Sequence, residues 1–434
     1  MDTFANNGCG VIRDRKIGGC RFTGIDSYRI FTRNDQLLGI KYQLNCMGSA
    51  SRMTNYANKY PRIKHLSLKA KKRMPKVAWE YLDSGTGDES LLRANQKSFE
   101  NVQFLPRFCK GPLEAQIGTT LFGQNYSAPI GIAPVGLTGL MWPKVEHHLA
   151  VTAKRMEIPY CLSTVATETP ETVGQRVGEM GWFQLYPPKD KEVRDSLLQR
   201  AQDSGFNVLV VTADVPMASR RERSKKAGLS IPPKITPKLL WEGITHPVWS
   251  YHTLRRGLPR LRTVEHYTNN SAMKFVSGFV GNRLGGTLDW DYCQELKETW
   301  RGPVVLKGIL HPKDAQKAMD IGLDGIYVSN HGARQFNGAI PAIEALPEIV
   351  KTVNGKVPIL FDSGIRSGLD VMRALYLGAD FVLAGRPFIH GVAALGKFGG
   401  DHVANILIDD LKNNMVQLGV KDLKELRKAQ AIIS

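Results

Sequence analysis

Eight short apolar runs divide the chain from residue 129 onward, and a stretch with helical spacing follows each run. Runs that are apolar throughout are typical of strands buried on both faces, as in parallel sheets. Eight strand–helix repeats predict an α/β fold, a closed (β/α)8 TIM barrel rather than an open sheet. The runs cover residues 129–135, 159–163, 182–186, 207–214, 303–308, 325–330, 358–363 and 381–386.

One connection is much longer than the others and covers residues 215–302, after the fourth run. Part of it, residues 223–262, holds nine basic residues and one acidic residue, Glu242, with Trp241, Trp249 and Tyr251. This long basic insertion after strand 4 is interpreted as a flap over the barrel mouth or as a membrane-interface segment, where aromatic rings and cations meet anionic lipid. Nucleic-acid binding is not favoured, because no reader motif accompanies the charge. The basic residues are Arg223, Lys225, Lys226, Lys234, Lys238, Arg255, Arg256, Arg260 and Arg262.

The whole chain is strongly basic, with 58 lysines and arginines against 40 acidic residues and a net charge of +18. This excess suits an anionic partner but does not choose between nucleic acid, an anionic membrane surface and an acidic substrate. No stretch approaches the roughly 20 apolar residues that span a bilayer. The six cysteines are widely spaced without a CxxC pair, which argues against a disulfide framework or a zinc site. No metal is expected.

Residues 1–58 differ from the rest, with three of the six cysteines and no clear periodicity. They are interpreted as a poorly defined extension ahead of a barrel domain at residues 59–434. A start codon assigned too far upstream, with Met47 or Met53 as the true start, explains the segment equally well. Residues 1–46 are therefore expected to be dispensable.

Polar and ionisable side chains follow the predicted strands at the ends where TIM-barrel enzymes carry their chemistry. A lone histidine after a strand is more often structural. Here Lys307, Asp214 and Arg334 are expected on the same rim as His331, which favours catalysis. The strand-end residues are Ser163, Gln184, Tyr186, Thr212, Asp214, Lys307, Ser329, Asn330, His331, Asp362 and Arg386.

Two loops near the end of the barrel combine glycine with arginine, at residues 362–368 and 384–387. Glycine lets backbone N–H groups approach an oxyanion, and arginine can bind it bidentately. Barrel enzymes commonly bind phosphate at this location. The ligand is expected to have a phosphate at one end and a reactive centre near Lys307 and His331.

The run Ser-Asn-His-Gly-Ala-Arg-Gln at residues 329–335 resembles the active-site signature of the FMN-dependent α-hydroxy acid dehydrogenases and oxidases. Segments at 81–85, 132–136, 183–186, 212–216, 220–222 and 306–308 are similar to the same family in the same order. The similarity extends from about residue 58 to about residue 425. Within the family, the long connection looks most like that of the bacterial membrane-associated L-lactate dehydrogenases.

The resemblance implies a role for each residue of the reactive centre. His331 would be the base, oriented by Asp214. Arg334 and Arg221 would hold the substrate carboxylate, since a planar guanidinium suits it better than lysine does. Tyr81 and Tyr186 would hydrogen-bond the carboxylate and hydroxyl, and Lys307 would stabilise negative charge on the reduced flavin. The expected FMN-binding residues are Pro134, Val135, Gly136, Ser163, Gln184, Thr212, Lys307, Ser329, Asp362, Gly364, Arg366, Gly385 and Arg386.

The activity that the resemblance implies is oxidation of an L-2-hydroxy acid, L-lactate foremost, to the 2-oxo acid. Electrons would pass to a quinone or cytochrome, with the protein, expected to be a homotetramer, at the cytoplasmic face of the inner membrane or in the cytoplasm. The alternatives are a soluble oxidase that reduces O2 to H2O2, or a longer or aromatic substrate such as mandelate. Val165 stands where glycolate oxidases have tryptophan, which implies a roomier pocket. The expected carboxylate site argues against a flavin isomerase, and the occupied catalytic positions argue against a non-catalytic lipid- or nucleic-acid-binding scaffold.

Overall fold

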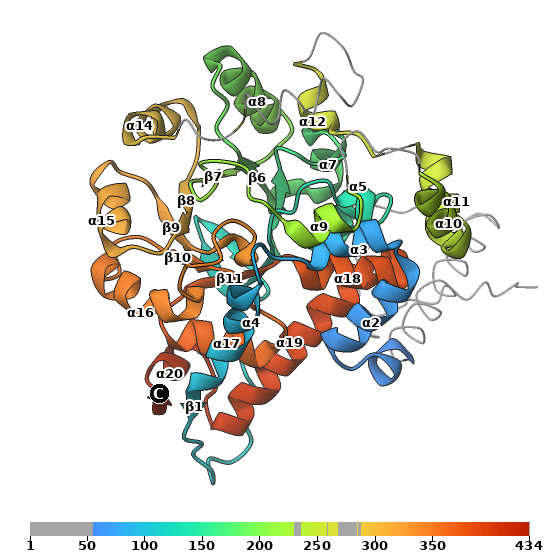
Figure 1. Cartoon of the computed structure of the whole chain (residues 1–434). Coiled ribbons are helices and arrows are strands. Elements are labelled where there is room, and N and C mark those ends of the chain that lie inside the picture. The colour runs from blue at the N-terminus through green and yellow to red at the C-terminus, as the bar shows by residue number, and fades with distance from the viewer. Residues whose placement is uncertain (1–54, 230–235, 258, 268–283, 285–287, 434) are drawn as a thin grey trace, which may run out of the picture. The chain divides into compact units, whose positions relative to one another are not determined.

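The eight apolar runs form eight parallel strands that close into a barrel, which confirms the predicted (β/α)8 fold (Figure 1). The computed structural model describes residues 55–229, 236–257, 259–267, 284 and 288–433. The strands are β4 (Ile130–Ile132), β5 (Tyr160–Ser163), β6 (Gly181–Leu185), β7 (Val208–Thr212), β8 (Val304–Ile309), β9 (Gly325–Val328), β10 (Ile359–Phe361) and β11 (Phe381–Ala384).

The barrel closes where β11 pairs with β4, in a register that places Val382 beside Ile130. Nearly every strand residue is buried, because side chains on one face fill the barrel and those on the other meet the helices. Trp182 and Tyr327 are among the largest fully buried side chains. The closed ring leaves no strand edge of the barrel open for pairing with another chain.

A helix follows nearly every strand and covers the outside of the barrel (Figure 1). These helices are α6 (Val145–Met156), α7 (Pro170–Val177), α8 (Lys191–Asp203), α14 (Trp290–Thr299), α15 (Pro312–Asp320), α16 (Ala342–Val353), α17 (Gly368–Tyr376) and α18 (Arg386–Leu395). They are followed by α19 (Gly399–Leu418) and α20 (Leu423–Arg427).

Helices α2 (Ile63–Arg73), α3 (Lys76–Asp83) and α4 (Ser90–Lys97) lie before the barrel in the described part of the chain. The strand that follows them, β1 (Val102–Phe104), pairs antiparallel with the C-terminal strand β12 (Ala431–Ile433). A small hairpin of β2 (Thr119–Leu121) and β3 (Gln124–Tyr126) leads into the barrel. The helices before the barrel matter because α3 carries Tyr81 and α4 carries Asn95.

The long connection between β7 and β8 contains the short helices α9 (Glu222–Lys226), α10 (Pro237–Thr245), α11 (Pro247–Arg256) and α12 (Arg262–Glu265). Trp249, predicted to belong to an interfacial surface, is instead buried, and its indole N–H donates to the backbone oxygen of Leu140 at 3.1 Å. Arg256 donates to the buried carboxylate of Glu168 at 2.5 Å. These contacts hold the connection against the barrel.

Most of the extension predicted at residues 1–58 lies outside the described residues, as do Lys234 and the side chain of Lys238. In the part of the chain that is described, no helix combines the length and apolar character needed to cross a bilayer.

Candidate active site

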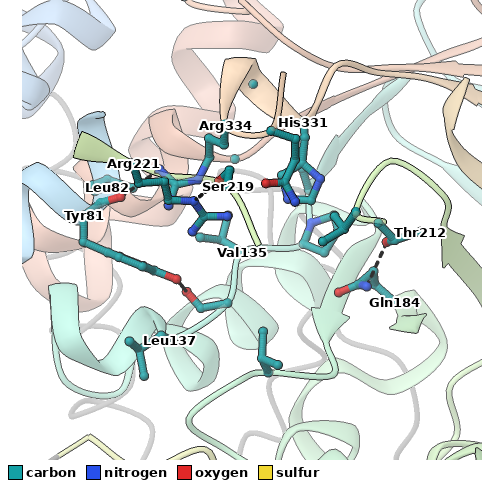
Figure 2. A pocket seen from close by; sticks show the side chains of 18 of the residues that line it. Tyr81, Leu82, Val135, Leu137, Gln184, Thr212, Ser219, Arg221, His331 and Arg334 are labelled. Carbon is teal, nitrogen blue, oxygen red and sulfur yellow. Dashed lines mark hydrogen bonds between the residues drawn. The ribbon is translucent and has the colours of Figure 1, made fainter. Parts of the chain in front are cut away.

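A cavity of about 710 Å³ opens at the carboxyl ends of the barrel strands (Figure 2). Nearly all the residues predicted for the site line it, from Tyr81 before the barrel to Arg386 after β11. The first residues of the long connection also contribute, and they bring Arg221 to the cavity. The strand-end position of the site is therefore as expected for a TIM barrel.

His331 lies between a carboxylate and a phenol. Its Nδ1 is 2.8 Å from Oδ1 of Asp214, and its Nε2 is 3.3 Å from the hydroxyl of Tyr186. A carboxylate only accepts hydrogen bonds, so Nδ1 carries the proton and Nε2 presents a lone pair to the cavity. Burial raises the pKa of Tyr186 well above its usual value, so the phenol stays protonated and donates to Nε2.

The charges around this pair favour a neutral imidazole beside an ionised carboxylate. Burial lowers the pKa of His331, and the neighbouring charge of Asp214 opposes that effect only in part. Burial alone would raise the pKa of Asp214, but His331 and Lys307 hold it below its usual value. A neutral imidazole with a free Nε2 next to a fixed negative charge can accept a proton and then stabilise it.

The backbone that carries His331 is strained. His331, Gly332 and Ala333 have φ values of 57°, 61° and 62°, all in the left-handed region. Residues other than glycine adopt this backbone conformation at a cost of roughly 1–3 kcal/mol each, and only where the surrounding structure holds them in it. Ser329 Oγ accepts from the His331 N–H at 3.0 Å, and Ser363 Oγ accepts from the Gly332 N–H at 3.1 Å. Hydrogen bonds on both sides of the turn therefore maintain it.

Two arginines lie close together beside the base (Figure 2). Arg334 is half-buried, and burial followed by repulsion from Arg221 lowers its pKa to about 10. One of its nitrogens, Nη1, donates to the carbonyls of Tyr81 and Ser84 at 2.8 and 2.9 Å, which leaves its other donors for a ligand. Two neighbouring guanidinium groups in a buried pocket are relieved by an anion, and a carboxylate matches their planar geometry.

Lys307 lies on the floor of the cavity and is only 4% exposed. Its Nζ donates to Ser329 Oγ at 2.7 Å and lies 3.4 Å from Oδ2 of Asp362. Ser329 in turn donates to Oδ1 of Asp362 at 2.5 Å. The buried ammonium is thus fixed by a serine and a carboxylate, and it presents positive charge from beneath the cavity.

Next to Lys307, a chain of polar side chains crosses three neighbouring strands and ends at Thr212, which pairs with Lys307 in the barrel. Ser163 Oγ donates to Oε1 of Gln184 at 2.7 Å, and Nε2 of Gln184 donates to Thr212 Oγ1 at 2.8 Å. The backbone of residues 134–136 lines the cavity above them. Such a row of hydrogen-bonding groups suits the polar edge of a flat ring.

The residues predicted to bind phosphate lie at the far end of the cavity. Arg366 is half-buried, and among the described residues its side chain has one hydrogen bond, from Nη1 to the Ile365 carbonyl at 2.7 Å. Helix α18 begins at Arg386 with Gly385 as its N-cap, so the positive end of the helix dipole points to the same place. A guanidinium with spare donors beside a helix N-terminus fits a phosphate.

Arg386 differs from expectation in one respect. Its guanidinium donates to three carbonyls, those of Leu82, Gly332 and Ser84, at 2.9–3.0 Å. The side chain therefore joins the base-carrying turn to the C-terminal end of α3. It stays a prediction that Arg386 binds the phosphate, now through its backbone N–H. The side chain expected to bind the phosphate is that of Arg366.

The cavity also includes residues that sequence reasoning did not assign to it. Met217, Leu229, Leu261 and Leu284 of the long connection line its mouth. No sequence pattern identifies these four residues as part of the cavity. Scattered aliphatic residues in an otherwise basic loop do indicate that part of the loop packs against the rest of the protein. They make the side of the cavity next to Val165 apolar.

Comparison with known proteins agrees with this geometry. Residues 70–433 match the FMN-dependent dehydrogenase family. The L-lactate dehydrogenase of Xanthobacter autotrophicus is 37% identical over 361 residues, which cover 83% of this chain and 93% of the relative. The L-lactate dehydrogenase of Ectopseudomonas mendocina is 37% identical over 359 residues, covering 82% and 94%.

Solved structures show the same similarity. The monotopic membrane protein (S)-mandelate dehydrogenase aligns with a TM-score of 0.82 and 31% identity, over 86% of this chain and 99% of that one. A mandelate oxidase aligns with a TM-score of 0.74 and 30% identity, over 86% and 99%. With a family match over most of its length and a cavity that fits a flat ring and a phosphate, this chain belongs to the FMN-dependent dehydrogenase family.

Proposed function

We propose that the protein oxidises an L-2-hydroxy acid, L-lactate foremost, to the corresponding 2-oxo acid. The observation that carries this proposal is the placement of the neutral His331, with its unprotonated Nε2, beside the half-buried pair Arg334 and Arg221. An α-hydroxy acid has a carboxylate one bond from the carbon that is oxidised. A site that holds the carboxylate on two guanidiniums therefore brings the reacting C–H and O–H groups to the base.

Each residue performs one task in this reaction. Arg334 and Arg221 bind and orient the carboxylate, and Tyr81 and Tyr186 lie where they can hydrogen-bond the substrate. The substrate loses two electrons and two protons, and Nε2 of His331 takes one proton whether it leaves the carbon or the hydroxyl. Asp214 stabilises the imidazolium that results.

FMN, when bound, would accept the two electrons and the second proton. Lys307, Ser163, Gln184, Thr212, Ser329 and the backbone of residues 134–136 would hold its ring and ribityl chain. Asp362, Gly364, Arg366 and the backbone N–H groups at Gly385 and Arg386 would hold the ribityl hydroxyls and phosphate. The buried charge of Lys307 favours a cofactor that becomes more negative on reduction.

The function is tested by adding L-lactate to the purified, flavin-loaded protein without oxygen. Loss of the oxidised-flavin absorbance is expected, with one pyruvate formed per flavin, while D-lactate leaves the spectrum unchanged. The reduced protein is then mixed with a quinone analogue or with O2, and faster reoxidation by the quinone is expected from a dehydrogenase. If no member of a panel of L-2-hydroxy acids that includes glycolate and L-mandelate reduces the flavin, the proposal is wrong.

We also propose that the long connection attaches the protein to a membrane through apolar side chains more than through charge. Helices α10 and α11 expose a set of large apolar residues, with Trp241 65%, Ile244 70% and Leu254 81% exposed. Burying such a side chain is worth about 1.5–3 kcal/mol, and exposed clusters of this kind are typical of interaction surfaces. The set is Leu240, Trp241, Ile244, Val248, Tyr251 and Leu254, here called the apolar hairpin surface.

The charges of the connection contribute less than the sequence predicts. Four of its nine basic residues are paired with carboxylates: Arg223, Arg256, Arg260 and Arg262. Lys225 and Lys226 of α9 are exposed, and further exposed lysines lie on helices outside the connection. The Val77 N–H donates to Glu242 of α10 at 3.4 Å, which brings the start of α3 and the exposed Lys76 beside this surface.

Co-sedimentation with phosphatidylglycerol-containing vesicles tests this surface. The triple variant Trp241→Ser, Ile244→Ser, Leu254→Ser is expected to stay in the supernatant, while the wild type sediments even at raised salt, where screening weakens charge attraction. The matched control removes three other exposed apolar side chains, Phe108, Ile432 and Ile433, and should sediment normally. Equal sedimentation of the hairpin variant and wild type would refute the proposal. The expected homotetramer is also a proposal, and sedimentation velocity measures it directly.

A further inference from the structure

We infer that Asn95, in helix α4 before the barrel, is a positioning residue for the base His331. The inference rests on the proposed function, because it concerns the geometry of that reaction. No sequence motif used above includes Asn95, and it does not line the cavity. Its side chain is only 2% exposed and faces the segment that carries the base.

Asn95 and Asn330 form a reciprocal pair of amide hydrogen bonds. Nδ2 of Asn95 donates to Oδ1 of Asn330 at 2.8 Å, and Nδ2 of Asn330 donates to Oδ1 of Asn95 at 2.6 Å. The same oxygen of Asn95 accepts from the Ala342 N–H at 3.3 Å, at the start of α16. Asn95 therefore contacts both ends of the segment that includes His331 and Arg334.

The orientation of Asn330 in turn supports the left-handed turn. Oδ1 of Asn330 accepts from the Ala333 N–H at 3.2 Å and so spans the three residues with positive φ. Only one rotation of the Asn330 amide presents this oxygen to Ala333 and its nitrogen to Asn95 at once. Asn95 therefore selects the Asn330 orientation that holds His331 in place, together with the Ile340 carbonyl, which accepts from the same nitrogen at 3.2 Å.

Asparagine is required at both positions because each amide must donate and accept simultaneously. Aspartate supplies acceptors only, and leucine supplies neither group. Without Asn95, the Ala342 N–H loses its acceptor, and the Asn330 amide keeps only the Ile340 carbonyl and the Ala333 N–H as partners. The segment after β9 can then relax away from its strained form. Displacing the base by about 1 Å costs on the order of 100-fold in rate.

The backbone of the same residue is also fixed. The carbonyl oxygen of Asn95 lies 2.1 Å from where a Cβ on Gly364 would be, so the phosphate-end loop packs directly against α4. Gly364 has φ of 100°, which a side chain would also oppose. Helix α4 is therefore held against one loop of the site by its backbone while it holds the base-carrying turn by its side chain.

The test is a double-mutant cycle on the full-length, FMN-loaded protein, with Asn95→Ala, Asn330→Ala and the double variant. Each single variant is expected to lose about 100-fold in kcat with KM within threefold, and the double variant to lose no more than the Asn330 variant. The isotope effect on kcat with 2-deuterated L-lactate should rise to its full value, because misplacement slows the proton-transfer step. Gln96→Ala, at the next and exposed position of α4, is the matched control and should change nothing.

Asn95→Ser is neutral and keeps one group that can both donate and accept, so it is the second variant if the alanine variant does not bind FMN. Its expected loss in kcat is smaller than that of alanine and appears without a change in FMN content. If Asn95→Ala and Asn95→Ser both keep kcat within threefold, or if the losses of the two alanine variants multiply in the double variant, the inference fails alone. Failure of the wild type to oxidise any L-2-hydroxy acid would instead overturn the proposed function.

Discussion

Replacing His331 with glutamine is expected to lower kcat about 10⁴-fold, at the upper end of what a general base contributes. Glutamine is close in size and keeps a hydrogen-bonding end near Asp214, but it has no lone pair that accepts a proton at neutral pH. FMN should remain bound, because the cofactor-holding groups lie on Lys307, Arg366 and the neighbouring strands. The measurements are stopped-flow flavin reduction and the flavin released on denaturation.

The matched control for this variant is His266→Gln, which changes an exposed histidine of the long connection. It should reduce its flavin as fast as the wild type. Flavin reduction near the wild-type rate in the His331 variant would show that another group takes the proton.

Asp214→Asn is expected to lower kcat about as much as His331→Gln does, up to roughly 10⁴-fold. The effect is large although Asp214 does not contact the proton that is transferred. Asparagine can donate to Nδ1, which moves the imidazole proton to Nε2 and abolishes the free lone pair. It also removes the negative charge that raises the pKa of His331 against the effect of burial. The imidazole of the variant is then a weaker base.

The pH profile separates this effect from a simple loss of structure. In the wild type, kcat should fall on acidification only below the usual pKa of an imidazole, because burial lowers the pKa of His331. Without Asp214 the pKa falls further, so the residual activity should persist to lower pH than in the wild type. Asp291→Asn, at an exposed position of α14, should leave both the rate and the profile unchanged. An unchanged acid limb in the Asp214 variant would contradict the assigned role.

The parts of the structure that follow from strand periodicity could be predicted from the sequence. Lys307 lies within β8 and Asp214 follows β7 by two residues, so the barrel alone brings both to one rim. The contacts between distant segments could not be predicted in this way. Neither the pairing of Asn95 with Asn330 nor the burial of Trp249 against Leu140 leaves a periodic signal, because each depends on how a helix outside the strand–helix repeats docks.

Arg386 shows why a sequence motif predicts where a residue lies better than it predicts which groups its side chain contacts. A glycine followed by arginine after the last strand predicted that the residue lies at the cavity, and it does. The C-terminal end of α3 supplies the carbonyls of Leu82 and Ser84, which accept hydrogen bonds from the guanidinium. Only the folded arrangement of that earlier segment decides between a phosphate and a carbonyl as the partner of the side chain.

The contributions of α3 and α4 have a consequence for attempts to transplant this chemistry. Tyr81, the carbonyl of Ser84 and Asn95 all belong to the 81–95 stretch, ahead of the first barrel strand. A designed barrel that copied only the eight strands and their loops would carry His331, Asp214 and Arg334 on an unsupported turn with one wall missing. The smallest unit that could be transferred with a working site is therefore the barrel together with the helices that precede it.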